Sequence, residues 1–338
     1  MAPTVLVTGA SGFLATHVVA TFLAKGYNVR GTVRSAKAAS AVRNSHPQFK
    51  DQLSTVVVPD IAVPDAFDAA VHDVDGIIHT ASPFFADAVD YENELFKPAV
   101  QGTTSVLDAA LKHGPSVSRI VITSSFAAVV DPLQGMRPGY SYTEADWNPV
   151  TKDMAMGGDG GLAYLASKTM AEKAAWDFVK KNKPNFSVAT ICPPMIYGPI
   201  AHGVDQPQSL NTSSKDIFRL IDGSEKTVPE TGIWAFADVR DVAEAHLRAF
   251  ESPAAGGERF LIASSAYSYQ QICDIIRAKF SELRDSTPEG AVGQELPQVY
   301  SLDTSKARNS LKMTFRPLRI TIEDTVEGLL ELQQQKQK

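Results

Sequence analysis

The chain has 338 residues, of which 44% are hydrophobic and 21% are charged, and its formal net charge is -6. This balance excludes a disordered tail, a small disulfide scaffold and a generally basic nucleic-acid binder, and the length predicts about two domains. No apolar stretch approaches the roughly 20 residues of a membrane span, and the start MAPTVLVTG lacks the basic flank of a signal peptide. We therefore expect a cytoplasmic protein with no nucleic-acid or membrane partner.

The charge is distributed unevenly along the chain. Residues 1–50 contain six Lys and Arg and no Asp or Glu, so this segment carries +6 and the remainder carries -12. Such an asymmetry indicates an anion site near the N-terminus, although a solvated basic face would give the same count.

Short β-branched runs alternate with helix-length stretches through the first 200 residues. This order predicts the α/β class: a Rossmann-type doubly wound parallel sheet with helices on both faces. The strands are expected at 4–7, 28–33, 54–58, 76–79, 119–123 and 187–191, and the long helices at 12–25, 95–113 and 162–182.

The regular alternation of predicted strands and helices ends after residue 198. Residues 1–198 plus about 232–264 are expected to form the dinucleotide-binding domain. A smaller C-terminal substrate lobe is expected from about 199–231 plus 265–338. The later elements are predicted as helices at 214–221, 239–250, 269–283 and 322–333 and a strand at 257–263.

The first predicted strand leads directly into a glycine-containing turn and a helix, in the order TGASGFLA. Gly9 would permit a tight turn, Gly12 would let backbone N–H groups approach a pyrophosphate, and Ala15 is small enough for close helix–strand packing. This placement predicts a dinucleotide phosphate site at the N-terminus of the helix.

The end of the second predicted strand selects the nucleotide. NAD-binding units carry Asp or Glu about 20 residues beyond the glycines, but this strand ends Thr-Val-Arg-Ser-Ala-Lys, without a carboxylate. Arg34 can hold a 2'-phosphate in a planar fork, and Lys37 adds a second positive charge. We therefore expect NADP(H) as the cofactor.

Three separated residues form a candidate catalytic set. Tyr164 and Lys168 stand four residues apart at the start of a predicted helix, so their side chains share one face. Ser125 closes the strand predicted at 119–123, at the sheet edge where ligands bind in such folds.

The combination resembles the extended short-chain dehydrogenase/reductases. Within this family, the combination of motifs is similar to that of the fungal NADPH-dependent methylglyoxal or isovaleraldehyde (carbonyl) reductases. Plant dihydroflavonol reductase is a more distant relative. The motifs span about residues 5–265 and lie at 8–15, 79–84, 100–103, 123–125, 164–168, 171–176, 197–199, 210–213 and 238–243.

The resemblance implies a reductase in which Tyr164 gives a proton to the carbonyl oxygen and Ser125, rather than Ser124, donates a hydrogen bond to that oxygen. Lys168 would bond the nicotinamide ribose, and its ammonium is expected to favour the Tyr164 phenolate. The Asn that many relatives use has no clear counterpart in 96–102.

Further candidates lie at strand ends and loops. The dinucleotide is expected to contact Gly9, Ser11, Gly12, Phe13, Leu14, Arg34, Lys37, Asp60, Ile61, Thr80, Ala81, Ser82, Tyr164, Lys168, Pro193, Ile196 and Ser213. Apolar residues near predicted loop edges suit a pocket for hydrophobic aldehydes or ketones, namely Phe84, Phe85, Phe126, Val130, Met195 and Trp234.

Two other functions stay open beside an NADPH-dependent carbonyl reductase. One is a nucleotide-sugar epimerase or dehydratase on the same fold, and the other is a nonenzymatic NADP(H) sensor. No His-Glu-x-x-His, Cys-x-x-Cys or Gly-x-Ser-x-Gly pattern is present, so we predict neither a metal site nor a serine hydrolase. The sequence leaves open a monomer or a homodimer, the physiological carbonyl and the stereochemistry of the product.

Overall fold

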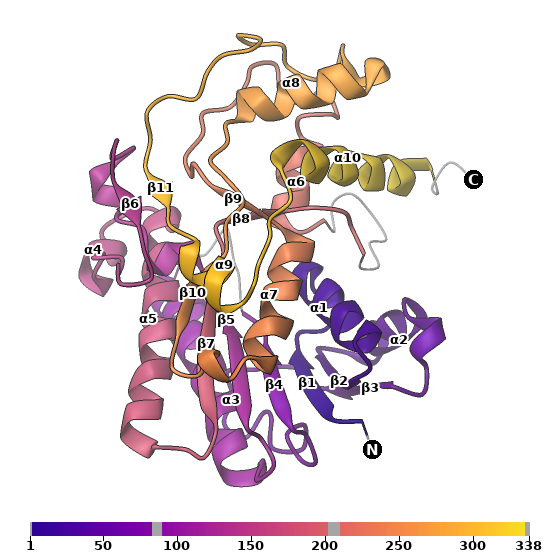
Figure 1. The fold of residues 1–338 in the computed structure, drawn as a ribbon, viewed down its shortest axis with the longest axis vertical. Helices are drawn as coiled ribbons and strands as arrows, with labels where there is room; N and C mark the ends of the chain where they lie inside the picture. The colour runs from indigo at the N-terminus through magenta and orange to yellow at the C-terminus, as the bar shows by residue number, and fades with distance from the viewer. Residues whose placement is uncertain (1, 83–89, 202–209, 335–338) are drawn as a thin grey trace.

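The computed structural model describes residues 2–82, 90–201 and 210–334. Within them, seven parallel strands form the main sheet in the order β10-β7-β5-β4-β1-β2-β3 (Figure 1). The direction of strand succession reverses between β1 and β4, which is the switch point where such sheets bind ligands. The strands are β1 (Thr4–Thr8), β2 (Asn28–Val33), β3 (Leu53–Val57), β4 (Gly76–His79), β5 (Arg119–Thr123), β7 (Ser187–Cys192) and β10 (Arg259–Leu261).

Helices cover both faces of this sheet because successive strand residues point to opposite sides and both sides are apolar. Val5 and Val7 pack in one core cluster with α1, α7 and α9, whereas Leu6 packs in another with α3 and α5. The helices are α1 (Phe13–Ala24), α2 (Ala36–Asn44), α3 (Lys97–His113), α4 (Lys152–Met156), α5 (Gly160–Asn182), α6 (Thr212–Phe218), α7 (Val239–Glu251), α8 (Tyr269–Lys279), α9 (Ser305–Ser310) and α10 (Leu318–Gln334).

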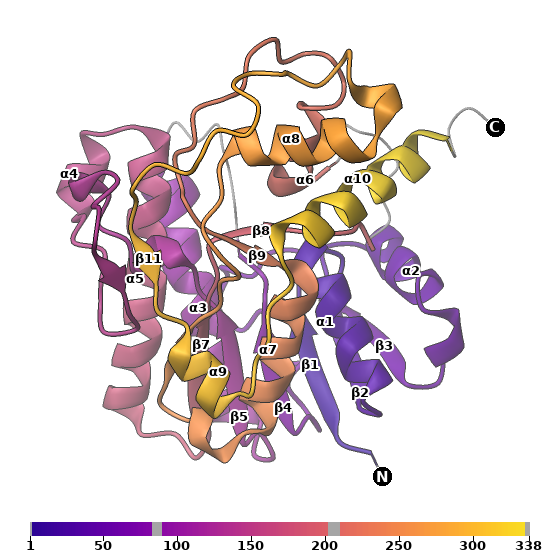
Figure 2. The same ribbon diagram turned by 45° about the horizontal axis from the view of Figure 1, so that its top comes forward.

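The smaller lobe has its own core, built from α6, α8 and α10 with Tyr197 and Phe236. The N-terminus lies at the end of the molecule opposite to α8, so the carboxyl ends of the strands face this lobe (Figures 1 and 2). Two short parallel pairs lie outside the main sheet: β8 (Met195–Tyr197) with β9 (Phe236–Asp238), and β6 (Ser141–Tyr142) with β11 (Ser301–Leu302).

The predicted Rossmann-type architecture is confirmed, and the six strands predicted in the first 200 residues lie within one residue of the observed ones. The strand predicted at 257–263 is shorter in the structure, Arg259–Leu261. The sequence did not predict α2, α4, α9 or the two small sheets. These elements are too short for a periodic pattern of apolar residues to reveal them. Ala307 and Leu311 pack in the same core cluster as the strands of the main sheet. No helix in the described ranges is long and apolar enough to cross a bilayer.

Candidate active site

The turn after β1 exposes backbone rather than side chains. Gly9 has a φ of +66°, and a Cβ added there would lie 3.1 Å from the backbone of Ala81. Gly12 is the N-cap of α1, and its N–H donates to the carbonyl of Gly9 at 2.9 Å. A side chain at Gly9 would be strained and crowded, so this turn stays open for an anionic ligand at the N-terminus of α1.

The hydroxyl of Thr8 links the end of β1 to the loop that follows β4, at the switch point of the sheet. Thr8 Oγ1 accepts from the N–H groups of Thr80 and Ala81, each at 3.1 Å, and lies 2.9 Å from His79 Nδ1. Burial lowers the pKa of His79 to about 3, so its ring is neutral. Because Thr8 Oγ1 already accepts from two N–H groups, its own O–H is free to donate a hydrogen bond to Nδ1. Thr8 and His79 thus hold the loop 80–82 beside the glycine turn, a role that the sequence motifs did not reveal.

A cavity of about 720 Å³ lies at these strand ends. Nine of the residues predicted to bind the dinucleotide line it: Gly9, Ser11, Gly12, Arg34, Asp60, Ile61, Thr80, Ala81 and Ser82. Asn93, Glu94 and Pro98 also line it. Sequence reasoning missed them because a π-helical turn, Glu92–Phe96, precedes α3 and brings this segment to the cavity.

Other predicted cofactor residues lie beyond the lining of this cavity. Phe13 and Leu14 lie in the first turn of α1, with Phe13 buried and Leu14 packed on the sheet core. Ile196 also packs against that core, and the carbonyl of Pro193 accepts from the N–H of Phe126 at 2.8 Å. The two remaining residues lie at helix starts, Lys37 exposed on α2 and Ser213 half-buried on α6.

The three candidate catalytic residues converge although two elements supply them. Asp159 caps α5 by accepting from the N–H of Leu162 at 2.9 Å, which starts the helix just before Tyr164. Ser125 follows β5, in extended backbone, and its side chain is hydrogen-bonded to that of Tyr164. Lys168 lies one turn further along α5 and donates to Ser82 Oγ at 2.8 Å.

Burial governs the ionisation of this set. Burial raises the pKa of Tyr164 above its ordinary value, and the hydrogen bond with Ser125 lowers it by less. Burial also lowers the pKa of Lys168 to about 8. In the protein without a bound nucleotide, desolvation of the phenol has the larger effect on its pKa. Tyr164 stays protonated at neutral pH.

A second cavity, of about 810 Å³, reaches α5 beside Tyr164. Val130 and Trp234 line it, as predicted for the substrate pocket, together with Leu165. Phe126 instead lies in a core cluster against Tyr142 and Tyr300, and Met195 packs against the core of the lobe. The two other predicted residues, Phe84 and Phe85, lie outside the described residues.

Mostly apolar groups line this second cavity, and its lining comes from segments far apart in sequence. Among its described lining residues there is no Lys, Arg or His, whereas two carboxylates, Glu230 and Glu295, are present. The remaining lining residues are Pro132, Gly135, Met136, Val228, Pro229, Thr231, Gly232, Ile233, Ser268, Gln270, Gly290, Ala291, Gln294, Pro297 and Tyr300. A large neutral ligand suits such a surface better than an anion.

Known proteins share this architecture over nearly the whole chain. The NADPH-dependent methylglyoxal reductase of Saccharomyces cerevisiae is 35% identical over 343 residues, which cover 97% of this chain and 98% of that protein. A ketoreductase of Aspergillus niger is 37% identical over 340 residues, with 98% of each chain covered. The crystal structure of yeast methylglyoxal/isovaleraldehyde reductase complexed with NADPH matches with a TM-score of 0.91 and 34% identity, covering 98% of this chain and 99% of that one.

The family model described as the NAD dependent epimerase/dehydratase family matches residues 5–263. This range contains the glycine turn, Ser125 and the Tyr164–Lys168 pair, and the expected resemblance to extended short-chain dehydrogenase/reductases is confirmed. The chain therefore belongs to the NAD dependent epimerase/dehydratase family.

Proposed function

We propose that this chain is an NADPH-dependent carbonyl reductase that converts aldehydes or ketones to alcohols. NADPH, when bound, supplies the hydride that is added to the carbonyl carbon. Tyr164 transfers its phenolic proton to the carbonyl oxygen, and the Ser125 hydroxyl donates a hydrogen bond to the same oxygen. Lys168 holds the nicotinamide ribose by its ammonium group. The hydride and the proton together complete the alcohol.

The observation that carries this proposal is that the catalytic set adjoins residues that line both cavities. Ser82 lines the first cavity and accepts from Lys168, while Leu165, the neighbour of Tyr164, lines the second. A reductase needs a proton donor at the boundary between its dinucleotide and its substrate. The raised pKa of Tyr164 suits the reducing direction, since the phenol still carries its proton at neutral pH.

The residues at the first cavity fit a dinucleotide with a 2'-phosphate. Gly9 and Gly12 line this cavity at the N-terminus of α1, and only a glycine at position 9 lets the turn lie this close to Ala81, which also lines it. Arg34 follows the end of β2, is exposed and lines the cavity, in the place where NAD-binding units carry a carboxylate. The relatives named NADPH-dependent agree with this choice of nucleotide.

The lining of the second cavity supports neutral, hydrophobic carbonyl compounds as substrates. Apolar walls would bind a hydrophobic substituent, and Glu230 and Glu295 would repel a carboxylate or a phosphate. This charge disfavours the alternative of a nucleotide-sugar epimerase or dehydratase, whose diphosphate substrate calls for cationic side chains. The alternative of a nonenzymatic sensor gives no role to the contact between Ser125 and Tyr164.

NADPH consumption with a panel of aldehydes, 2-oxoaldehydes, β-ketoesters and flavanonols tests the proposal. We expect turnover with several neutral members and stoichiometric formation of the alcohol. NADPH binding without turnover of any carbonyl would favour a sensor. Tightly retained NAD, together with conversion of a nucleotide sugar, would favour the epimerase alternative.

Two further expectations belong with this proposal. We infer that the enzyme acts in the cytoplasm as a monomer or homodimer. Cell fractionation tests the location, and sedimentation equilibrium tests the oligomeric state.

A further inference from the structure

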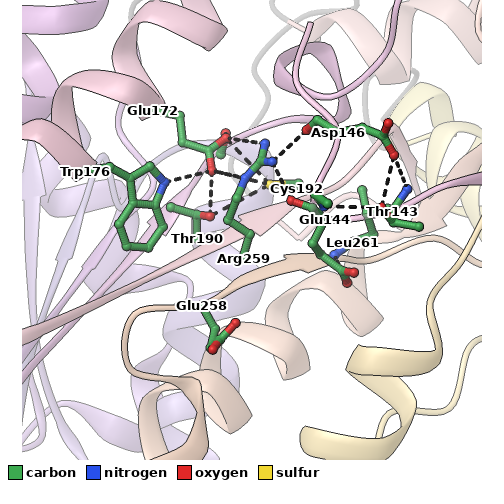
Figure 3. A network of polar contacts seen from close by, with 12 residues as sticks. Thr143, Glu144, Asp146, Glu172, Trp176, Thr190, Cys192, Glu258, Arg259 and Leu261 are labelled. Carbon is green, nitrogen blue, oxygen red and sulfur yellow. Dashed lines mark hydrogen bonds and ion pairs between the residues drawn. The ribbon is translucent and has the colours of Figure 1, made fainter.

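Helix α5 carries a third polar residue on the face that bears Tyr164 and Lys168. Glu172 follows Lys168 by four residues, so the three side chains lie on successive turns of one helix face. The side chain of Glu172 is 0% exposed, and no role in the proposed reaction has been given to it. Figure 3 shows its carboxylate facing the guanidinium of Arg259.

The Glu172 carboxylate joins α5 to three neighbouring strands of the sheet. Its Oε1 accepts from Arg259 Nε on β10 at 2.7 Å and from Thr190 Oγ1 on β7 at 2.8 Å. Its Oε2 accepts from Ser124 Oγ, just after β5, at 2.5 Å. Trp176 Nε1 donates to Oε1 at 3.3 Å. Both oxygens are thus saturated by donors held on separate elements.

Arg259 holds the carboxylate in place and is itself held on its other side. Its Nη1 donates to the carbonyls of Glu144 and Asp146, each at 2.7 Å, and its guanidinium lies 3.7 Å from the centroid of the Trp147 ring. The side chain of Arg259 is only 9% exposed. A buried pair with every polar group satisfied has one arrangement, which makes it a rigid reference point for whatever it touches.

The contact with Ser124 matters because Ser125 is the next residue. The two serines are consecutive in the chain, so a hydrogen bond that holds Ser124 also restricts the backbone position of Ser125. Ser124 is bonded to Glu172, and Ser125 is bonded to Tyr164. Both acceptor residues lie on α5, and therefore two hydrogen bonds, two helical turns apart, fix the end of β5 against the same helix.

We propose that Glu172, clamped by Arg259, is a positioning residue that aims Ser125 at Tyr164 through the hydroxyl of Ser124. This inference rests on the proposed reductase function. Loss of the Ser124–Glu172 bond leaves the nucleotide cavity unchanged but lets the end of β5 shift relative to α5. A shift of the Ser125 hydroxyl weakens its bond to the carbonyl oxygen in the transition state.

Ser124→Ala tests this role with Thr190→Val as the matched control. Both variants remove one hydroxyl from the same buried carboxylate, but β7 carries none of the three catalytic residues. We expect Ser124→Ala to lower kcat about tenfold with the KM for NADPH unchanged, because misplacement of a catalytic group slows the chemical step. Thr190→Val should lower the melting temperature similarly and leave kcat nearly unchanged. Ser124→Thr, which keeps the hydroxyl, should restore kcat.

A double-mutant cycle separates positioning from general stability. If Ser124 acts through Ser125, the Ser124→Ala change should have almost no effect on kcat in a Ser125→Ala background. An equal loss of kcat in both backgrounds, or equal losses for Ser124→Ala and Thr190→Val, would overturn the positioning role while leaving the reductase function intact. No turnover of any carbonyl by the wild-type protein would instead refute the proposed function, and the inference with it.

Discussion

The two cavities of this protein are similar in size, but different kinds of segments line them. The nucleotide cavity, of about 720 Å³, is formed largely by the turns that directly follow β1, β2, β3 and β4. The second cavity, of about 810 Å³, is assembled from loops of both lobes and one turn of α5. Strand ends of a parallel sheet meet at one edge by topology, whereas the loops meet only through the packing of the smaller lobe.

This difference implies a division of labour. Changes at the strand ends should alter the affinity for NADPH whatever the carbonyl compound, and changes in the second cavity should alter the choice of carbonyl compound whatever the nucleotide. Ser125 and Tyr164 adjoin residues that line the second cavity or contact each other, so changes at these two hydroxyls should affect turnover rather than NADPH affinity.

The largest effect is expected for Tyr164→Phe, which removes the proton donor at the boundary. We expect kcat to fall by about 10²- to 10⁴-fold, the usual contribution of general acid catalysis, with NADPH affinity unchanged. Single-turnover kinetics and fluorescence titration of NADPH provide the two measurements. Tyr27→Phe is the control, since that phenol bonds Glu251 far from the cavities. An unchanged kcat would refute the role of Tyr164.

A smaller effect is expected for Arg34→Ala at the nucleotide cavity. Loss of a charged hydrogen bond to the 2'-phosphate should weaken NADPH binding by about 1.5 to 3 kcal/mol and leave NADH binding nearly unchanged. Isothermal titration with both nucleotides measures the difference. Arg43→Ala, which removes another positive charge from the same basic segment, is the control. Equal losses with NADPH and NADH would contradict a 2'-phosphate contact.

The pH dependence of kcat/KM should reflect the ionisation of Lys168. Burial lowers the pKa of this lysine to about 8, so the ammonium that holds the ribose loses its proton above that pH. Since the charged form is the competent one, kcat/KM should fall about tenfold per pH unit above about 8. Lys168→Arg keeps its charge at all these pH values, and its residual activity should show no such decline. A flat wild-type profile through pH 10 would contradict this assignment.

The smallest effect is expected in the second cavity. A neutral ketoester should be reduced faster than its free acid, and Glu230→Gln or Glu295→Gln should raise kcat/KM for the acid by roughly two- to fivefold each. Both carboxylates are exposed, so screening keeps the effect small, and added salt should reduce it further. Glu282→Gln, away from the cavity, is the control. If the ester and the acid stay equivalent in every variant, charge does not select the substrate.

Sequence patterns predicted the cavity-lining residues at strand ends more successfully than those in loops. The glycine turn, Arg34 and the loop 80–82 all line the nucleotide cavity, because each follows a strand whose end could be read from its apolar run. In the second cavity only Val130 and Trp234 of the four described candidates are lining residues. Phe126 and Met195 are equally apolar, and apolarity alone does not separate a cavity wall from a core.

Two tertiary contacts could not be predicted from the sequence, although Glu172 lies within the motif at 171–176. Glu94 reaches the nucleotide cavity through a π-helical turn, and such a turn lacks a distinct residue pattern. Glu172 and Arg259 are 87 residues apart in the chain, so their ion pair cannot be read from spacing. Burial, which raises the pKa of Tyr164, likewise depends on the surrounding elements and cannot be read from the neighbour four residues away.

The sequence by itself determined the alternation of strands and helices, the open turn at Gly9 and the shared helix face of Tyr164 and Lys168. These features depend on local backbone sterics and on residues within one or two turns of each other. The burial of the catalytic groups, the ion pair of Glu172 with Arg259 and the choice of loops that line the second cavity followed only from the three-dimensional structure. Those properties arise from contacts between distant segments, whose free energy is set by packing.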